Sequence, residues 1–266
     1  MKAIYATLAL SGLFWVALSA QTPIPTSVDV AFEVASVRPN NSGAVNSSTS
    51  GRGGSFTATN VTAHQLIIYA YRLRPFQLAS GPRWIGSDRF DIQARPPENA
   101  KPDNPAMTRA LLRDRFKLVA HTETRQEQVY GLVLARGDGR LGPQLKPSTQ
   151  NCAAAQPGTP SPCGMNTSTN DTTGRLVGTG QSMEQLAAAL GGFGLNRMVL
   201  DRTGLTGSFD IELKWTPDNA RNSSAQSNDA PSIFAALQEQ LGLRLDSQRG
   251  PVEFLLVDSI ERPTLD

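Results

Sequence analysis

The sequence predicts an α+β protein built from two similar halves, and three observations support this. The phrase Phe-Asp-Ile follows a glycine-containing turn twice, in GPRWIGSDRFDIQARP and in GLTGSFDIELKWTP. Around both phrases, segments of helical periodicity lie between segments in which apolar and polar residues alternate. These segments come in the same order before and after the middle of the chain. We therefore expect a tandem duplication of one small sheet-plus-two-helices unit: strand, helix, strand, helix and hairpin.

Four pairs of matching segments support the duplication, at offsets of 119 to 125 positions. Residues 62–66 match 182–186, 90–92 match 209–211, 110–118 match 235–243, and 129–134 match 252–257. The small differences between the offsets indicate short insertions in loops.

The elements of each half follow from local patterns. FEVASVRP alternates and predicts a strand that joins the first sheet, while FTATN and RLVGTG predict a short strand in each half. Thr62 and Ser182 are suitable N-caps for the helices that come next. FDIQARP and FDIELKW then predict half-buried strands that end at a proline.

The remainder of each half is expected to be a second helix and a β-hairpin. The helices are predicted over 107–115 and 233–240, and the hairpins join KLVAHTETRQ to VYGLVLA and LRLDSQRG to VEFLLVD. The second half has one additional predicted strand, at 197–201. Because a small sheet with two helices buries one face, α+β layers are expected.

The domain boundaries follow from composition. Residues 1–20 place a lysine before a short apolar run that ends in small residues, which is typical of a secretory signal peptide. Residues 28–148 should form the first half and 174–266 the second, with 149–173 as a disulfide-containing linker. The segment 40–55 is rich in Gly, Ser and Asn and is expected to be a loop.

The charge and cysteine content restrict the partners and the compartment. A formal net charge of +2 gives no electrostatic reason to expect nucleic acid or an acidic membrane surface as a partner. No membrane span is expected in the mature chain. Cys152 and Cys163 flank a Pro/Gly-containing loop, so a local disulfide in an oxidising compartment is favoured. Two free thiols or half of a metal site are the alternatives.

The sequence predicts no catalytic or metal site and no cofactor. His64 and His121 stand alone, and neither H-E-x-x-H nor G-x-S-x-G is present. A pair of carboxylates remains conceivable for glycoside hydrolysis. The candidates are Asp88, Asp91, Asp210, Glu212 and Glu253, although their alternation along strands is typical of a solvated sheet face.

The candidate binding residues belong to the repeated phrase and its flanks: Arg83, Trp84, Asp201, Arg202, Thr203 and Trp215. Asp201 to Thr203 could form a polar rim for a ligand, although an Asp and an Arg so close are more often a local ion pair that supports a turn. Trp84 and Trp215 stand at element boundaries, where a tryptophan serves either as a lid on the core or as a rigid binding anchor.

The segments FEVASVRPN, FTATNVTAHQLIIYAY, GPRWIGSDRFDIQARPP and VLDRTGLTGSFDIELKWTPD resemble a soil-associated family of secreted proteins abundant in Acidobacteria. That family is a domain of unknown function, so the resemblance implies a secreted setting and supplies no catalytic residues. The half-repeat also resembles the short N-terminal domain of secretins and TonB-dependent receptors, which makes protein contacts in the periplasm.

The sequence therefore predicts a secreted or periplasmic, non-catalytic binding or protein-interaction module. Its partner would be an envelope protein or an extracellular ligand, held at exposed strand edges or in a groove. Two alternatives stay open. One is an extracytoplasmic sensor domain for a small ligand, and the other is a carboxylate-based hydrolase acting on cell-wall or soil polymers.

Overall fold

The computed structural model describes residues 31–52, 55–98, 103–150, 152, 161–170, 172–193, 195–217 and 231–264. The expected signal peptide, residues 1–20, lies outside these ranges. The chain forms two compact units of sheet and helix, in agreement with an α+β fold. The first unit contains residues up to Arg72, 79–123 and 255 onward, and the second contains 73–78 and 124–254. These boundaries differ from the expected halves because the chain passes between the units four times.

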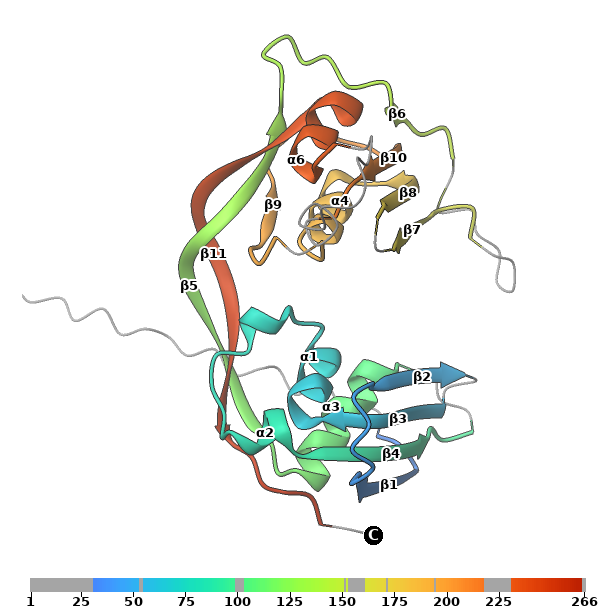
Figure 1. Ribbon diagram of the computed structural model, residues 1–266, viewed down its shortest axis with the longest axis vertical. Coiled ribbons are helices and arrows are strands. Elements are labelled where there is room, and N and C mark those ends of the chain that lie inside the picture. Colours follow the sequence, from blue (N-terminus) through green and yellow to red (C-terminus); the bar gives the residue numbers. More distant parts are fainter. Residues whose placement is uncertain are drawn as a thin grey trace, which may run out of the picture. The chain divides into compact units, whose positions relative to one another are not determined.

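The first unit contains a four-stranded antiparallel sheet with α1 and α3 on one face (Figure 1). Its strand order is β1-β4-β3-β2, and the helices lie between β3 and β4 and after β4. The elements are β1 (Val34–Pro39), β2 (Ser48–Arg52), β3 (Ser55–Thr62), α1 (Ala63–Tyr71), η1 (Pro75–Gln77), α2 (Trp84–Ser87), β4 (Arg89–Arg95) and α3 (Asn104–Arg115). η1 belongs to the second unit. The segment 40–55, which was predicted as a loop, contains the edge strand β2. Its residues are polar and show no apolar alternation, and backbone pairing to β3 holds the strand in place.

The alternation in the strands places one face of this sheet in the core. Val37, Phe56 and Ile92 point inward and are at most 1% exposed. They pack with the buried faces of the helices, which carry Leu66, Ile67, Met107 and Leu112. Burying one such side chain contributes about 1.5–3 kcal/mol, so this face supplies much of the stability of the unit.

The predicted N-caps of α1 and α4 are confirmed, whereas α3 begins at Asn104, three residues before its predicted start. Thr62 Oγ1 accepts a hydrogen bond from Gln65 N at 3.2 Å, and the Gln65 side chain accepts one from Thr62 N at 2.9 Å. Ser182 and Gln185 form the same capping box at 3.2 and 2.8 Å. Each N-cap satisfies backbone donors that the helix leaves unpaired, which stabilises it by about 1 kcal/mol.

The second unit contains a sheet of order β6-β10-β8-β7, again antiparallel. Its elements are β6 (Leu145–Pro147), β7 (Gly164–Thr169), β8 (Gly174–Gln181), α4 (Met183–Leu190), β9 (Val199–Asp201), β10 (Phe209–Trp215) and α6 (Ile233–Ala236), which continues as the π-helix η3 (Leu237–Leu241). Two expectations differ here. β7 lies within the predicted linker, and the helix predicted over 233–240 changes to π-helical geometry after Ala236.

The two predicted hairpins are wrong. β5 (Val119–Leu134) and β11 (Leu243–Ser259) are single long strands, and they pair with each other in a sheet of order β11-β5-β9. Ala135 N donates to Gly242 O at 2.8 Å at one end of this pair, and His121 contacts Asp258 at the other, so the strands are antiparallel. Each strand contributes residues to both units. Residues 126–128, where a tight connection was expected, lie within β5 and continue it as one strand. No hairpin forms there because the partner of β5 is β11, from a distant part of the chain.

Both Phe-Asp-Ile phrases hold a β-bulge in the neighbouring strand. Asn60 and Gly180 adopt left-handed conformations, with φ of 56° and 64°. Asp91 Oδ1 accepts a hydrogen bond from Asn60 N at 2.8 Å, and Asp210 Oδ1 accepts one from Gly180 N at 3.0 Å. The aspartate of the phrase thus satisfies the backbone N–H that the bulge removes from the ladder.

Replacing Asp91 by alanine should lower the free energy of unfolding by about 1–3 kcal/mol, because Asn60 N would lose its acceptor. Asn60 is only 2% exposed, so water cannot readily replace the carboxylate. Asp91→Asn retains an acceptor oxygen and should cost less. Urea denaturation of the two variants tests this, and equal losses would contradict the assigned role.

Candidate binding site

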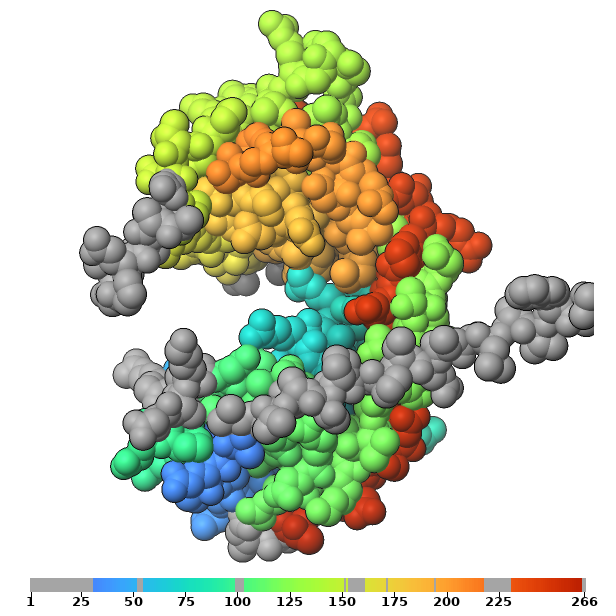
Figure 2. Space-filling model, turned by 180° about the vertical axis from the view of Figure 1, so that it is seen from behind, coloured from blue at the N-terminus to red at the C-terminus, as the bar shows by residue number. Residues whose placement is uncertain are grey.

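A polar groove of about 420 Å³ lies in the first unit, where β1 ends and β4 begins. Its lining comes from three segments: Pro39, Asn40 and Asn41 after β1, Ser87, Asp88, Arg89 and Phe90 between α2 and β4, and Arg262 and Pro263 near the C-terminus. Figure 2 shows the C-terminal segment, in red, at the surface of the first unit. The groove therefore combines residues that lie far apart in the sequence.

The β1 side of the groove is fixed by Asn40. Its backbone N–H donates to Arg89 O at 2.8 Å, and Nδ2 donates to Asp91 Oδ1 at 2.7 Å. Oδ1 of Asn40 accepts hydrogen bonds from Ser42 N and Ser42 Oγ. Asp91 therefore holds both the bulge and this side of the groove in place.

The opposite side is formed by the one-turn helix α2 and the C-terminal segment. Arg262 Nε donates to Asp88 Oδ2 at 2.9 Å, while its guanidinium carbon lies 5.3 Å from the centre of the Trp84 ring. An exposed ion pair contributes little by itself, about 0–1 kcal/mol. The cation–π contact adds about 0.5–1 kcal/mol, so the two contacts together attach the C-terminal segment to α2.

The lining of the groove is polar, with charged and amide side chains. Arg89 and Arg262 supply guanidinium groups, and Arg89 Nη1 donates to Asn60 O at 2.8 Å. Among the described lining residues, Asp88 is the one carboxylate, and it is paired with Arg262. The described part of the lining has no histidine or cysteine. Its guanidinium and amide groups can hold a polar or anionic partner through hydrogen bonds.

The structure brings together two of the six predicted binding residues. Trp84 borders the groove through its contact with Arg262, and Arg83 is exposed at the start of α2. Asp201, Arg202 and Thr203 lie in the second unit. Asp201 Oδ1 accepts from Thr203 N and Oγ1 at 2.9 and 2.8 Å, and Arg202 N donates to Leu132 O at 2.9 Å. These contacts form a turn at the end of β9.

The remaining candidate, Trp215, lies in the core of the second unit. It is 3% exposed, and its ring centre is 4.7 Å from that of Phe193. The indole also covers Gly174, where a Cβ atom would overlap it. We leave Trp215 out of the candidate site because its side chain is not accessible.

Sequence reasoning missed a histidine–carboxylate pair. His121 Nδ1 lies 2.8 Å from Asp258 Oδ1, and the two side chains are 28% and 43% exposed. Both come from the first unit, on β5 and β11. Because the paired strands are more than a hundred residues apart, no local signal could have found this contact. The contact links β5 to β11 within the first unit.

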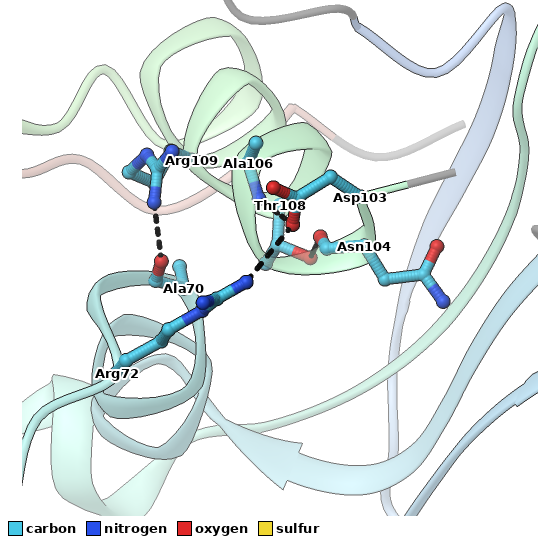
Figure 3. A network of polar contacts seen from close by, with 7 residues as sticks. All are labelled: Ala70, Arg72, Asp103, Asn104, Ala106, Thr108 and Arg109. Carbon is cyan, nitrogen blue, oxygen red and sulfur yellow. Dashed lines mark hydrogen bonds and ion pairs between the residues drawn. The ribbon is translucent and has the colours of Figure 1, made fainter. Parts of the chain in front are cut away.

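A second polar cluster in the first unit joins the end of α1 to the start of α3 (Figure 3). Arg109 Nη1 donates to Ala70 O at 2.9 Å, and Arg72 pairs with Asp103 at 3.4 Å. Asp103 Oδ1 in turn caps α3 through Ala106 N at 3.3 Å. Burial, with a smaller contribution from Asp103, raises the pKa of the nearby Tyr69. These contacts complete helix ends, so the cluster has a structural role.

The predicted disulfide between Cys152 and Cys163 is confirmed. It packs on Gly180, the bulge residue of β8, because both sulfur atoms lie where a Cβ atom of residue 180 would be. At the corresponding position of the first unit, Asn60 Nδ2 donates to Ala44 O and Asn46 O at 2.7 and 2.8 Å. In each unit, the bulge residue contacts the segment before the edge strand. Asn60 does so through hydrogen bonds, and Gly180 does so by giving room to the disulfide.

Lys214 and Arg175 hold the pKa of Glu212 below its ordinary value of 4.5, Lys214 having the larger effect. Because the folded pKa is lowered, the stabilisation is present above the unfolded pKa and disappears as the pH falls through the folded value. Glu212→Gln should therefore cost less than about 1 kcal/mol at pH 7, since the site is partly exposed. At a second pH well below 4.5 the difference should be smaller, and it should vanish once the pH lies below the folded pKa. Urea denaturation at both pH values tests this, and a constant difference would contradict it.

Among the described residues, no helix is long and apolar enough to span a bilayer. Within the same part of the chain, no three His, Cys, Asp or Glu side chains gather in a group that could hold a metal ion.

The fold is an α+β scaffold of two units, the first of which carries a polar surface groove. The chain belongs to the family described as protein of unknown function (DUF3738), whose model matches residues 64–260. No curated protein and no solved structure matches the chain.

Proposed function

We propose that this protein is a non-catalytic binding or protein-interaction module that works outside the cytoplasm, and that the groove in the first unit receives its partner. The main observation is the arrangement of Trp84, Asp88 and Arg262 beside the groove. Tryptophan and arginine are enriched among the residues that dominate binding energy. The partner would be an envelope protein or an extracellular ligand.

The extracytoplasmic location rests on two observations. The signal-peptide pattern in residues 1–20 predicts export, and the disulfide between Cys152 and Cys163 is of a kind that persists in oxidising compartments.

We also infer that the two halves arose by duplication of one binding scaffold. The orders β1-β4-β3-β2 and β6-β10-β8-β7 place corresponding strands at the same positions in the two sheets. The capping boxes and the aspartate-supported bulges recur at offsets of 119 and 120. Each unit thus offers a sheet of the same strand order with exposed strand edges, although the side chains on the sheet faces differ between the units.

An affinity experiment with matched variants tests the groove. The mature, tagged protein is incubated with the envelope fraction of its own host, beside Trp84→Ala, Arg262→Ala and Arg244→Ala. Arg244 is the control because it forms an exposed ion pair with Asp246 at 3.0 Å, close to the 2.9 Å of Arg262 and Asp88. A partner that binds the wild type and the Arg244 variant, but at least about tenfold less of either groove variant, supports the proposal.

Equal retention of that partner by all four proteins would contradict the assignment of the groove.

The size of the groove, about 420 Å³, also suits a small molecule, which favours the sensor alternative as the second candidate. Retention of a small ligand in place of a protein would support that alternative. The hydrolase alternative needs two facing carboxylates, and the described lining of the groove supplies one, Asp88.

A further inference from the structure

The outer face of the first sheet has a second depression, of about 370 Å³, separate in its lining from the groove. It is lined by Val34, Ser36, Ser55, Thr57, Gln93, Ala94 and Arg95. Ala94 is 4% exposed and faces the core, so it contributes its backbone. The outer face presents two serine hydroxyls, one threonine hydroxyl, a carboxamide and a guanidinium, beside the exposed apolar side chain of Val34. The volume is within the range of about 300–1,000 Å³ that small-molecule sites occupy.

The strand register gathers these side chains. Ser36 of β1 and Thr57 of β3 both pair with Gln93 of β4, so the three form one row across the sheet. Arg95 is opposite Val34, one row along. Because paired residues in a sheet share a face, these groups lie on the side away from the helices. The depression therefore presents several hydrogen-bond donors beside one cation.

Among the residues that the structure describes, the lining of this depression contains no carboxylate. Within the same part of the chain, no carboxylate forms an ion pair with Arg95. The corresponding face of the second sheet differs. There Glu212 lies 3.1 Å from both Arg175 and Lys214, and it is opposite Val177 of β8. At the matching positions of the first sheet, offset by 119 or 120, Gln93 replaces Glu212, Arg95 replaces Lys214 and Ser55 replaces Arg175.

We propose that this depression binds a carboxylate-bearing saccharide. The ligand carboxylate would pair with Arg95 as the Glu212 carboxylate pairs with Lys214 in the second sheet. The sugar hydroxyls would exchange hydrogen bonds with Ser36, Thr57 and Gln93, which offer both donors and acceptors. An acidic peptide would satisfy Arg95 but would leave these polar side chains with fewer partners. This site is independent of the groove and does not rest on the function proposed for it.

Calorimetric titration at low ionic strength tests the proposal, with trigalacturonate as the probe. Its methyl ester serves as the neutral control and triglutamate as the acidic peptide control. Arg95→Ala removes the cation, whereas Gln93→Glu supplies an internal carboxylate that should pair with Arg95 and close the site. Lys214→Ala is the matched control in the second sheet. All three positions lie on solvent-facing sides of strands, and unchanged urea midpoints would verify that the variants fold.

Trigalacturonate should bind the wild type and Lys214→Ala equally, and about tenfold more weakly to Arg95→Ala and Gln93→Glu, a loss typical of a charge-assisted contact. Trp84→Ala and Arg262→Ala should leave this binding unchanged, which separates the site from the groove. Three results would overturn the proposal: no binding of trigalacturonate at millimolar concentration, equal binding of its methyl ester, or unaltered binding to Arg95→Ala and Gln93→Glu. Equal or tighter binding of triglutamate would overturn the saccharide assignment.

Discussion

Trp215→Ala should lower the free energy of unfolding by about 3–5 kcal/mol, the usual cost of removing a large buried aromatic side chain. The substitution would leave a cavity beside Phe193 and uncover Gly174, and the rigid backbone of β8 and β10 limits how far the site can collapse. Denaturation by urea, followed by the fluorescence of the remaining tryptophans, measures the loss.

The matched control is Trp84→Ala, because Trp84 is also at an element boundary but is only half-buried at the surface of the first unit. It should cost clearly less than Trp215→Ala while weakening the binding of the groove partner. Comparable losses of stability in the two variants would contradict the distinction between a core tryptophan and a binding tryptophan.

Gly180→Ala should lower the free energy of unfolding by about 2–4 kcal/mol, through two effects that add. The residue has φ of 64°, where an L side chain is strained. Its Cβ atom would also overlap Cys152 Sγ and lie 2.7 Å from Cys163 Sγ, so the disulfide would have to move away from the bulge.

Two controls separate these effects. Gly204 has φ of 70°, and an added Cβ atom would meet no other atom within 4 Å, so Gly204→Ala should show the backbone cost alone, about 1 kcal/mol. Repeating Gly180→Ala in a Cys152→Ala, Cys163→Ala background should remove most of the additional loss. If Gly180→Ala costs the same with and without the disulfide, the packing of the sulfur atoms on Gly180 has no energetic role.

The features that could be predicted from the sequence are those that nearby residues determine. Thr62 and Ser182 cap their helices because each hydroxyl reaches a backbone N–H three residues later. The Phe-Asp-Ile strands follow from strict alternation, and the disulfide joins two cysteines within one loop. In each case the partners lie within about a dozen residues of one another, so a local pattern carries enough information.

The features that could not be predicted depend on partners distant in the sequence. The alternation in β5 is compatible with a hairpin or with a single strand, and only the pairing with β11 decides between them. The groove likewise requires Arg262 to reach Asp88, a separation of 174 residues. Trp84 and Trp215 both stand at element boundaries, and tertiary packing places the first at the surface and the second in the core.

The discontinuity of the first unit has a consequence for the order in which the protein matures. Residues 255–264 complete this unit, yet the ribosome makes them after the whole of the second unit. A nascent chain that has emerged as far as residue 254 therefore lacks Asp258, the partner of His121, and Arg262, the partner of Asp88. The first unit must therefore stay incomplete until residues 255–264 have been made, and the groove forms only after Arg262 and Pro263 have emerged.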